Sequence, residues 1–321
     1  MTTRLTGATI VLPDRLLPSG SLVIEDGRIA DVSPQQITDA RDLTGHYIVP
    51  GFIDVHVHGV LGVDSLDGGD AVARIARHLP RFGVTAFCPT SVACTPADLR
   101  ELLRAVRAAR EAAEPGAARV LPAHLESNFI NPDFKGAQPL ACIRTPRETR
   151  DGDFSGQEIL DEIAASRPDV GIVTVAPEMD GVLELIPELV RNGHRVSIGH
   201  SGANYEQARA GIAAGARHAT HLFNRMTPLH HREPGMVGAV LESEEVAAEI
   251  VCDGVHVHAA AVRAAVSAKS AAKIMAITDG TAGSGMPVGS RATLGGRPIT
   301  VKDAAYLDDG TLAGSVLTMD R

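Results

Sequence analysis

The sequence predicts an α/β protein whose main domain is a parallel (β/α)8 barrel of the TIM type. Eight short apolar runs follow one another from Ile53 onward, and segments rich in Ala, Leu, Arg and Glu separate them. This alternation is typical of a parallel sheet whose strands are joined by helical crossovers. Residues of metal-binding types stand at the ends of several runs, where the carboxyl face of a barrel would gather them.

The first fifty residues predict a small β-module, residues 1–50, because their pattern differs from the rest. Short alternating stretches are separated by turn residues such as Pro13, Gly20 and Gly27. Alternating runs with short turns between them are typical of hairpins. The stretches lie at 7–12, 21–24, 28–32 and 46–49. We expect this module to form part of a small β-sandwich.

The barrel is expected over residues 51–280. Its strands are predicted at 52–58, 84–91, 120–127, 171–178, 195–201, 216–223, 247–253 and 272–279. Helices are predicted at 96–113, 156–166, 180–192, 205–214 and 259–268. An open doubly wound sheet is the alternative, but no glycine-rich phosphate loop follows the first strand. Residues 281–321 are predicted to be a hairpin-rich extension leading toward a C-terminal part of the β-module that the chain lacks.

Composition narrows the classes of partner. The chain has 321 residues, a formal net charge of -9 and a pI near 5.8, which argues against nucleic-acid or anionic-membrane binding. Neither a signal segment nor a long apolar span occurs, so we expect a soluble, cytoplasmic protein. The four cysteines have no paired spacing, which favours reduced thiols.

Two histidines end the first predicted strand. Side chains two apart on a strand share one face, so His56 and His58 can converge on one point. An isolated pair of this kind would more often serve hydrogen bonding. Further ligand types at the ends of other predicted strands favour a metal site instead: Glu126, His200, His221 and Asp279.

We expect two divalent metal ions about 3.5–4 Å apart, or a single ion, at the barrel mouth. Some barrel hydrolases bridge their metals with a carboxylated lysine, but no lysine ends a predicted strand here. Glu126 is therefore expected to bridge, with His56 and His58 on one metal and His200 and His221 on the other. Asp279 suits both a metal ligand and a general base.

Motifs along the whole chain support a family resemblance. They are PGFIDVHVHG at 50–59, HLES at 124–127, IGHSGA at 198–203, THLFNRM at 220–226, HREPGMVG at 231–238, CDGVHV at 252–257, ITDG at 277–280 and DGTLAGS at 309–315. In this order they resemble the N-acetylglucosamine-6-phosphate deacetylases of the amidohydrolase superfamily. The first motif marks only the superfamily, whereas THLFN, HREPG and DGTLAGS mark the deacetylases.

The resemblance implies hydrolysis of the acetamide of N-acetyl-D-glucosamine 6-phosphate, giving D-glucosamine 6-phosphate and acetate, with zinc or iron as the metal. A metal would acidify a water and polarise the carbonyl, and Asp279 would carry the proton to the departing amine. The resemblance further implies a homodimer. It points to Arg232 and His256, with Asn224 nearby, as the residues that bind the phosphate.

Five positions depart from the family pattern, all around the expected sugar. Ser127 and Asn128 replace a Gly-Pro pair, Gln138 replaces a histidine that helps to bind substrate, Arg225 replaces a small residue and Gly280 replaces alanine. Gln138 and Arg225 are still expected to contact substrate.

The identity of the substrate therefore stays open. A different N-acyl amino sugar or an N-acyl amino acid is one alternative, and a non-catalytic barrel relative is another.

Overall fold

The computed structural model describes residues 1–147 and 153–321, which divide into two compact units, Met1–Gly51 and Phe52–Arg321. The strands of the first unit form one five-stranded sheet. They are β1 (Thr2–Val11), β2 (Leu16–Glu25), β3 (Arg28–Ser33), β4 (Arg41–Asp42) and β5 (Tyr47–Ile48). Antiparallel pairing in the order β3-β2-β1 produces two hairpins, and β4 and β5 add to β1 in parallel.

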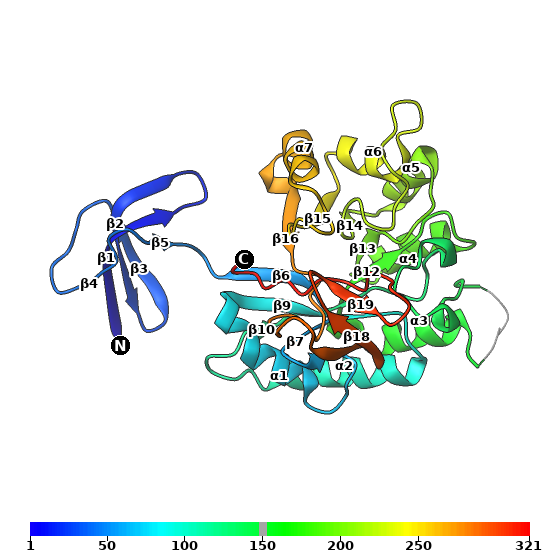
Figure 1. Ribbon diagram of the computed structural model, residues 1–321, viewed down its shortest axis with the longest axis horizontal. Helices are drawn as coiled ribbons and strands as arrows, with labels where there is room; N and C mark the ends of the chain where they lie inside the picture. The colour runs from blue at the N-terminus through cyan, green and yellow to red at the C-terminus, as the bar shows by residue number, and fades with distance from the viewer. Residues whose placement is uncertain (148–152) are drawn as a thin grey trace. The chain divides into compact units, whose positions relative to one another are not determined.

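The second unit contains the predicted barrel of eight parallel strands (Figure 1). The strands are β6 (Phe52–Val57), β9 (Val84–Ser91), β11 (Ala123–Leu125), β12 (Val170–Val175), β13 (Arg195–Ile198), β14 (His218–Ala219), β15 (Ala247–Val251) and β16 (Ile274–Ile277). β6 pairs with β9, and the order continues through β11 to β16. This confirms the predicted barrel and excludes the doubly wound alternative.

The barrel closes where its last strand meets its first. The amide of His58 donates to the Gly280 carbonyl over 2.8 Å, and the amide of Asp279 donates to the His56 carbonyl over 3.1 Å. A parallel bridge also joins Val57 to Gly280. Two predicted ligand positions, on β6 and after β16, are therefore held side by side by backbone hydrogen bonds.

Helices surround the strands (Figure 1). They are α1 (Ala71–His78), α2 (Pro96–Glu111), α3 (Gly156–Ala165), α4 (Val182–Arg191), α5 (Tyr205–Ala214), α6 (Gly235–Glu242) and α7 (Ala259–Lys269). Side chains satisfy several helix N-termini: Ser155 forms a capping box with Glu158, and Asn204 does so with Gln207. These caps fix where the crossover helices α3 and α5 begin.

The shortest barrel strand is β14, which covers only His218 and Ala219, whereas the sequence predicts a strand over 216–223. The chain leaves the extended conformation at His221, whose φ is 29°, and Phe223 has a φ of 79°. Positive φ values are incompatible with a continuing strand. The apolar run continues beyond the strand because Leu222 is fully buried in the turn that follows.

Small strands cover the carboxyl end of the barrel. The hairpin of β7 (Gly59–Val60) and β8 (Val63–Asp64) follows β6. A further short strand, β10 (Arg119–Val120), pairs instead with Ala86 and Phe87 in the amino-terminal half of β9. An antiparallel sheet of β17 (Arg291–Leu294), β18 (Arg297–Val301) and β19 (Ala305–Leu307) follows the last barrel strand. Val92, Leu294, Ile299, Ala305 and Ala313 form its own small core.

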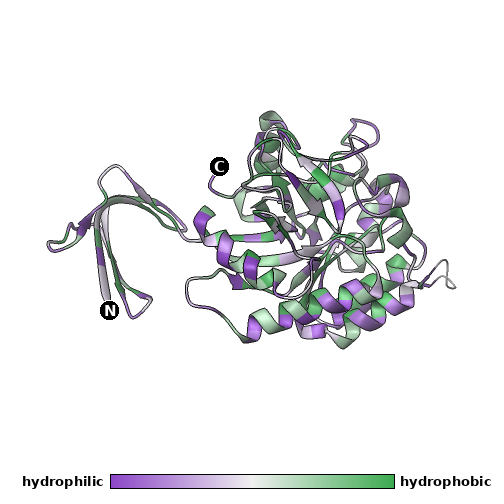
Figure 2. Cartoon of the chain, turned by 60° about the horizontal axis from the view of Figure 1, so that its bottom comes forward, coloured by the Kyte–Doolittle hydropathy of each residue, from purple (hydrophilic) through white to green (hydrophobic). Residues whose placement is uncertain are grey.

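Apolar burial accounts for the barrel and its helices. Figure 2 shows helices with hydrophobic and hydrophilic stripes, and the large buried cluster joins side chains of the strands to those of α1, α2 and α4. An amphipathic helix of this kind is stabilised mainly by packing its apolar stripe on a sheet. In the described part of the chain, no helix is long and apolar enough to span a membrane.

Replacing Leu102 in α2 with alanine should destabilise the barrel. Leu102 is 1% exposed and belongs to the main core, so the free energy of unfolding should fall by about 2–5 kcal/mol. Leu183→Ala, at a position 39% exposed, should change it by less than about 1 kcal/mol. Urea unfolding of the chelator-treated proteins would measure both, and equal losses would contradict the burial of Leu102.

Candidate metal centre

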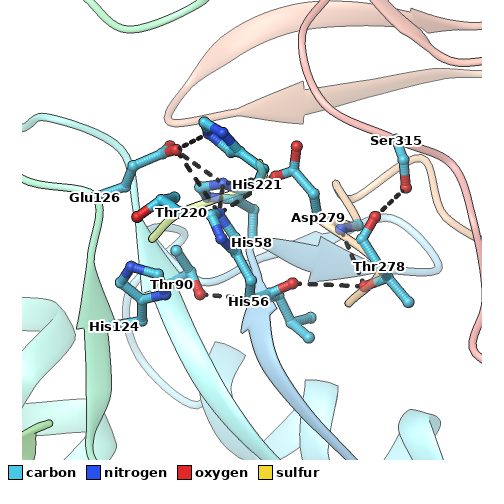
Figure 3. A network of polar contacts seen from close by, with 12 residues as sticks. His56, His58, Thr90, His124, Glu126, Thr220, His221, Thr278, Asp279 and Ser315 are labelled. Atoms are coloured by element: carbon cyan, nitrogen blue, oxygen red, sulfur yellow. Dashed lines mark hydrogen bonds and ion pairs between the residues drawn. The ribbon is translucent and has the colours of Figure 1, made fainter. Parts of the chain in front are cut away.

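Two groups of side chains meet at the carboxyl end of the barrel (Figure 3). In the first, the Nε2 atoms of His56 and His58 lie 3.2 Å apart. Asp279 Oδ1 lies 3.3 Å from His56 Nε2 and 3.4 Å from His58 Nε2, and Glu126 Oε2 lies 3.5 Å from His58 Nε2. Three strand ends thus contribute to one cluster of donor atoms.

The second group shares Glu126 with the first. Glu126 Oε1 lies 2.8 Å from His200 Nε2 and 2.7 Å from His221 Nε2, and the two Nε2 atoms are 3.1 Å apart. Oε1 faces the second group and lies 3.8 Å from His56 Nε2, whereas Oε2 is the oxygen nearer His58. This is the arrangement that a carboxylate bridging two metals requires.

The protonation of the histidine rings tests whether these groups suit a metal. His56 Nδ1 faces Glu249 over 2.9 Å and His200 Nδ1 faces the Phe134 carbonyl over 2.9 Å, so both Nδ1 atoms must donate. The Nε2 lone pairs then point at the Nε2 atoms of His58 and His221. Two ring nitrogens at this distance need a proton or a cation between them. Imidazole nitrogens with carboxylate oxygens fit a transition-metal ion.

Left-handed backbone conformations occur at three of these positions. φ is 47° at His200, 29° at His221 and 49° at Asp279. Non-glycine residues rarely adopt such angles, and they accumulate where surrounding structure imposes them, often at functional sites. Each residue follows the end of a barrel strand, so the turn directs its side chain over the mouth instead of along the strand.

Charges around the centre shift the protonation of its groups. Burial opposes protonation of His56, but Glu249, Asp279 and Glu126 outweigh it and raise the pKa of His56 to about 10. Burial would raise the pKa of Glu126, yet His200, His221 and His56 hold it well below its ordinary value. The centre therefore combines an ionised carboxylate with an imidazole that binds a proton tightly when no metal replaces it.

A deeper layer supports the centre from below. His124 is fully buried, and its Nδ1 donates to the Val55 carbonyl over 3.0 Å while Nε2 faces Thr174 Oγ1 over 2.8 Å. Burial lowers the pKa of His124 to about 3, so its ring is neutral. Both ring nitrogens of His124 are hydrogen-bonded to protein groups. His124 therefore has no nitrogen available to bind a metal, although it lies near His56 and Glu249.

Asp279 is fixed from several sides. Its carbonyl accepts from the Ser315 amide over 2.9 Å, and the side chain of Ser315 donates to the Thr278 carbonyl. Thr278 in turn donates from Oγ1 to Asp54 over 2.7 Å. Figure 3 shows Thr278 between the site and Ser315. Residues near the C-terminal end of the chain thus hold the turn that carries the Asp279 carboxylate.

The structure brings four of the five predicted substrate residues to one pocket beside the centre. The pocket is lined by His58, Glu126, His200, His221 and Asp279 together with Gln138, Asn224, Arg225 and His256. Arg232 lies elsewhere: it is exposed and lines a neighbouring cavity with Tyr205 and Thr227. The HREPG motif therefore does not reach this pocket within the described chain.

Gln138 contacts the centre itself. Its side-chain oxygen accepts from the Ala93 amide over 2.7 Å, which orients the amide group so that Nε2 donates to Glu126 Oε2. His256 is held by Asp253, whose carboxylate lies 2.6 Å from Nδ1. Asn224 donates to the His221 carbonyl over 3.2 Å. The Arg225 side chain lies against Gly136, 2.8 Å from where a Cβ would stand.

Sequence reasoning missed Glu249. It stands in the middle of β15, in the run AAEIV, and it is fully buried. A charged residue inside a buried strand is unusual unless it is paired, and that was the available signal. Asp253 was missed as well, because its role is visible only through its contact with His256.

The fold and site define a hydrolase of the amidohydrolase class. The model of the amidohydrolase family matches residues 47–292. An N-acetylglucosamine-6-phosphate deacetylase of Lysinibacillus sphaericus is 36% identical over 93% of this chain and 76% of its own length. The chain therefore belongs to the N-acetylglucosamine-6-phosphate deacetylase family of the amidohydrolases, which confirms the predicted resemblance.

Two further relatives bear on the substrate. An N-acetylgalactosamine-6-phosphate deacetylase of Escherichia coli O157:H7 is 35% identical over 100% of this chain and 82% of its own length. Among solved structures, an N-acetyl-D-glucosamine-6-phosphate deacetylase variant from Mycobacterium smegmatis, in complex with N-acetyl-D-glucosamine-6-phosphate, matches with a TM-score of 0.89 and 32% identity. The match covers 99% of this chain and 81% of the Mycobacterium smegmatis chain.

Binding of a divalent metal should release protons. The pKa of His56 is raised to about 10, so at pH 7 its ring carries a proton that a metal must displace. Apparent affinity should therefore rise with pH, by up to about tenfold per pH unit for each displaced proton. Calorimetric titration with Zn²⁺ in two buffers of different ionisation enthalpy measures the release. Identical heats in both buffers would contradict a protonated metal-free centre.

Proposed function

We propose that this protein is a metal-dependent deacetylase that hydrolyses N-acetyl-D-glucosamine 6-phosphate to D-glucosamine 6-phosphate and acetate. The observation that carries the proposal is the convergence of Glu126, four histidines and Asp279 on one pocket. Membership of the family supports the reaction class. The pocket also contains groups that suit an anionic sugar, namely Arg225 and His256.

One or two divalent ions, zinc or iron, are part of the proposal. His56 and His58 would hold one ion, His200 and His221 the other, and Glu126 would bind both. Asp279 would complete the first group, since Oδ1 faces both of its histidines. When bound, such a metal supplies a Lewis acid for the amide carbonyl and lowers the pKa of a water toward neutrality.

Asp279 is the proposed general base and acid. Neighbouring imidazoles, against the effect of burial, lower the pKa of its carboxyl, so it is ionised and can accept the proton of the attacking water. The same carboxyl then returns a proton to the amide nitrogen, because an amine leaves only after protonation. Hydrogen bonds from Ser315 and to His56 hold its backbone, so the carboxylate keeps one position during both transfers.

The phosphate is proposed to bind at the outer part of the pocket. Only the imidazolium form of His256 could donate from Nε2 to an anion, since Nδ1 already donates to Asp253 over 2.6 Å. Arg225 is exposed at the pocket, and its guanidinium forms no hydrogen bond or ion pair within the described residues. A guanidinium can grip phosphate with two parallel hydrogen bonds. Asn224 would line the sugar beside them, and Arg232 would reach the phosphate only from outside this pocket.

N-acetyl-D-galactosamine 6-phosphate is the second candidate substrate, because the Escherichia coli relative that carries that name is 35% identical over the whole of this chain. The two sugars share the acetamide and the phosphate, so the same centre could act on either.

The organisation of the chain completes the proposal. We assign residues 1–50 to a small β-module, 51–280 to the catalytic barrel and 281–321 to an extension over its mouth. We also propose a cytoplasmic homodimer, on the family resemblance alone. Sedimentation of the purified chain would test the dimer.

Asp279→Asn should abolish deacetylation while leaving metal bound. The amide cannot accept the water proton, so kcat should fall by at least about 100-fold, the range attributed to general acid–base catalysis. Acetate release from N-acetyl-D-glucosamine 6-phosphate, with zinc or ferrous iron, would measure it. The galactose isomer and the unphosphorylated sugar belong in the same assay.

Three outcomes would separate the alternatives. Release that depends on metal, phosphate and Asp279 supports the leading substrate, whereas faster release from the galactose isomer supports the second candidate. Absence of release from every sugar, despite bound metal, would exclude both sugars.

Arg225→Ala should weaken binding of the phosphorylated sugar specifically. Loss of one charge-assisted contact, worth about 1.5–3 kcal/mol, should raise KM by roughly 10–100-fold and leave metal content unchanged. Arg263→Ala, on the exposed face of α7, is the charge-matched control. Equal effects of Arg225→Ala on phosphorylated and unphosphorylated sugars would argue against a phosphate contact. Arg232→Ala in the same assay measures whether that side chain also contributes.

A further inference from the structure

Glu249 is a fully buried carboxylate with three donors, and the catalytic steps above do not use it. It lies in β15 and has no exposed surface. Oε2 accepts from His56 Nδ1 over 2.9 Å and from the His221 backbone amide over 3.1 Å, while Oε1 accepts from His218 Nε2 over 2.8 Å. One side chain thus joins β6, β14 and β15 directly beneath the metal centre.

The contact with His56 decides which ring nitrogen of that histidine faces the centre. A carboxylate only accepts, so His56 Nδ1 must carry hydrogen and Nε2 is left as the donor atom for a metal. The hydrogen bond to Glu249 also fixes the rotation of the ring. Since the two nitrogens lie on different sides of the ring in the same plane, holding Nδ1 at Glu249 directs Nε2 toward the centre. Without an acceptor at Nδ1, hydrogen could move to Nε2 and block the position where a metal would bind.

The contact with His221 acts on the backbone. His221 has a φ of 29°, and its amide donates to Glu249 Oε2, while the next amide, of Leu222, donates to the Glu249 carbonyl over 2.8 Å. Both hydrogen bonds stabilise the left-handed turn that points the His221 ring at Glu126. Glu249 therefore touches one histidine from each of the two groups.

Glu249 is not itself placed as a metal ligand. It lies near His56 and His124, but His56 Nδ1 and His124 Nδ1 both carry hydrogen, since their partners are a carboxylate and the Val55 carbonyl. Both oxygens of Glu249 already accept hydrogen bonds. The deeper group is therefore a hydrogen-bonded support for the centre above it.

We propose that Glu249 is a positioning residue that presents His56 Nε2 to the first metal and holds the His221 turn at the second. The inference rests on the proposed function, because it requires the metal centre. Its expected effect is unequal between the two metals. Glu249 sets the tautomer of a ligand only for the metal at His56 and His58, so that metal should depend on it more.

The test compares two substitutions of Glu249 by metal content. Glu249→Gln keeps one oxygen for His56 and His221, and its amide can donate to His218 once that ring changes tautomer. It should keep the fold and both metals but bind the first metal about 10–100-fold more weakly. Glu249→Leu has no acceptor and should bind one metal in place of two. Cobalt titration followed by visible absorption, with elemental analysis of the dialysed protein, measures stoichiometry and ligand environment without an activity assay.

His218→Leu is the matched control. It removes a partner of the same carboxylate, from Oε1, and leaves the acceptor of His56 and His221 in place. Both metals and the wild-type cobalt spectrum should persist in this variant. If Glu249 only stabilised the fold, His218→Leu and Glu249→Gln would instead change metal content in proportion to their loss of thermal stability.

The outcomes distinguish this inference from the proposed function. A wild-type protein that binds no divalent ion would sink the proposed function, and this inference with it. A wild-type protein with two metals, together with Glu249→Gln of unchanged affinity and spectrum, would overturn the role of Glu249 alone. If Glu249→Leu does not fold, the Gln variant decides the question.

Discussion

The structure depends on one constraint: several charged groups are buried together at the carboxyl end of the barrel, and each must be paired. Glu126, Glu249 and Asp279 are all largely excluded from water. An isolated buried carboxylate costs many kcal/mol, so such groups persist only with partners that offset desolvation. Imidazoles and backbone amides are those partners here. The chain has left-handed turns at His200, His221 and Asp279, and these turns bring the side chains of the three residues together at the centre.

Closure of the barrel brings the buried carboxylate of Asp279 to its imidazole partners. The hydrogen bonds between β6 and the end of β16 set the spacing between the paired histidines and the carboxylate of Asp279. The segment after residue 281 then fixes the far side of that turn through Ser315, and it lines the pocket with Leu294, Leu312 and Ala313. Water exclusion strengthens each electrostatic contact inside. The hydrogen bonds that close the barrel are thus the same ones that place the ligand-type side chains.

Much of this was accessible from the sequence. The run at 84–91 and the helix at 205–214 match β9 and α5 residue for residue, because their ends carry clear turn and cap residues. Strand-end positions also explain why the six ligand-type side chains meet, although their roles stay predictions. What could not be read was contact between distant segments. The pairing of Glu249 with His56 spans 193 residues, and the separation of Arg232 from the pocket follows from a loop path that no local pattern encodes.

The glutamine at position 138 gives the centre a property that the family's histidine would not. Its amide donates to Glu126 Oε2, and its oxygen accepts from the Ala93 backbone amide, so one side-chain contact and one backbone contact fix its orientation. A primary amide has the same charge at every physiological pH, whereas a histidine gains a proton near pH 6.5. The Glu126 carboxylate thus has a neighbour whose charge does not change with pH, so this side of its electrostatic surroundings stays constant when the pH falls.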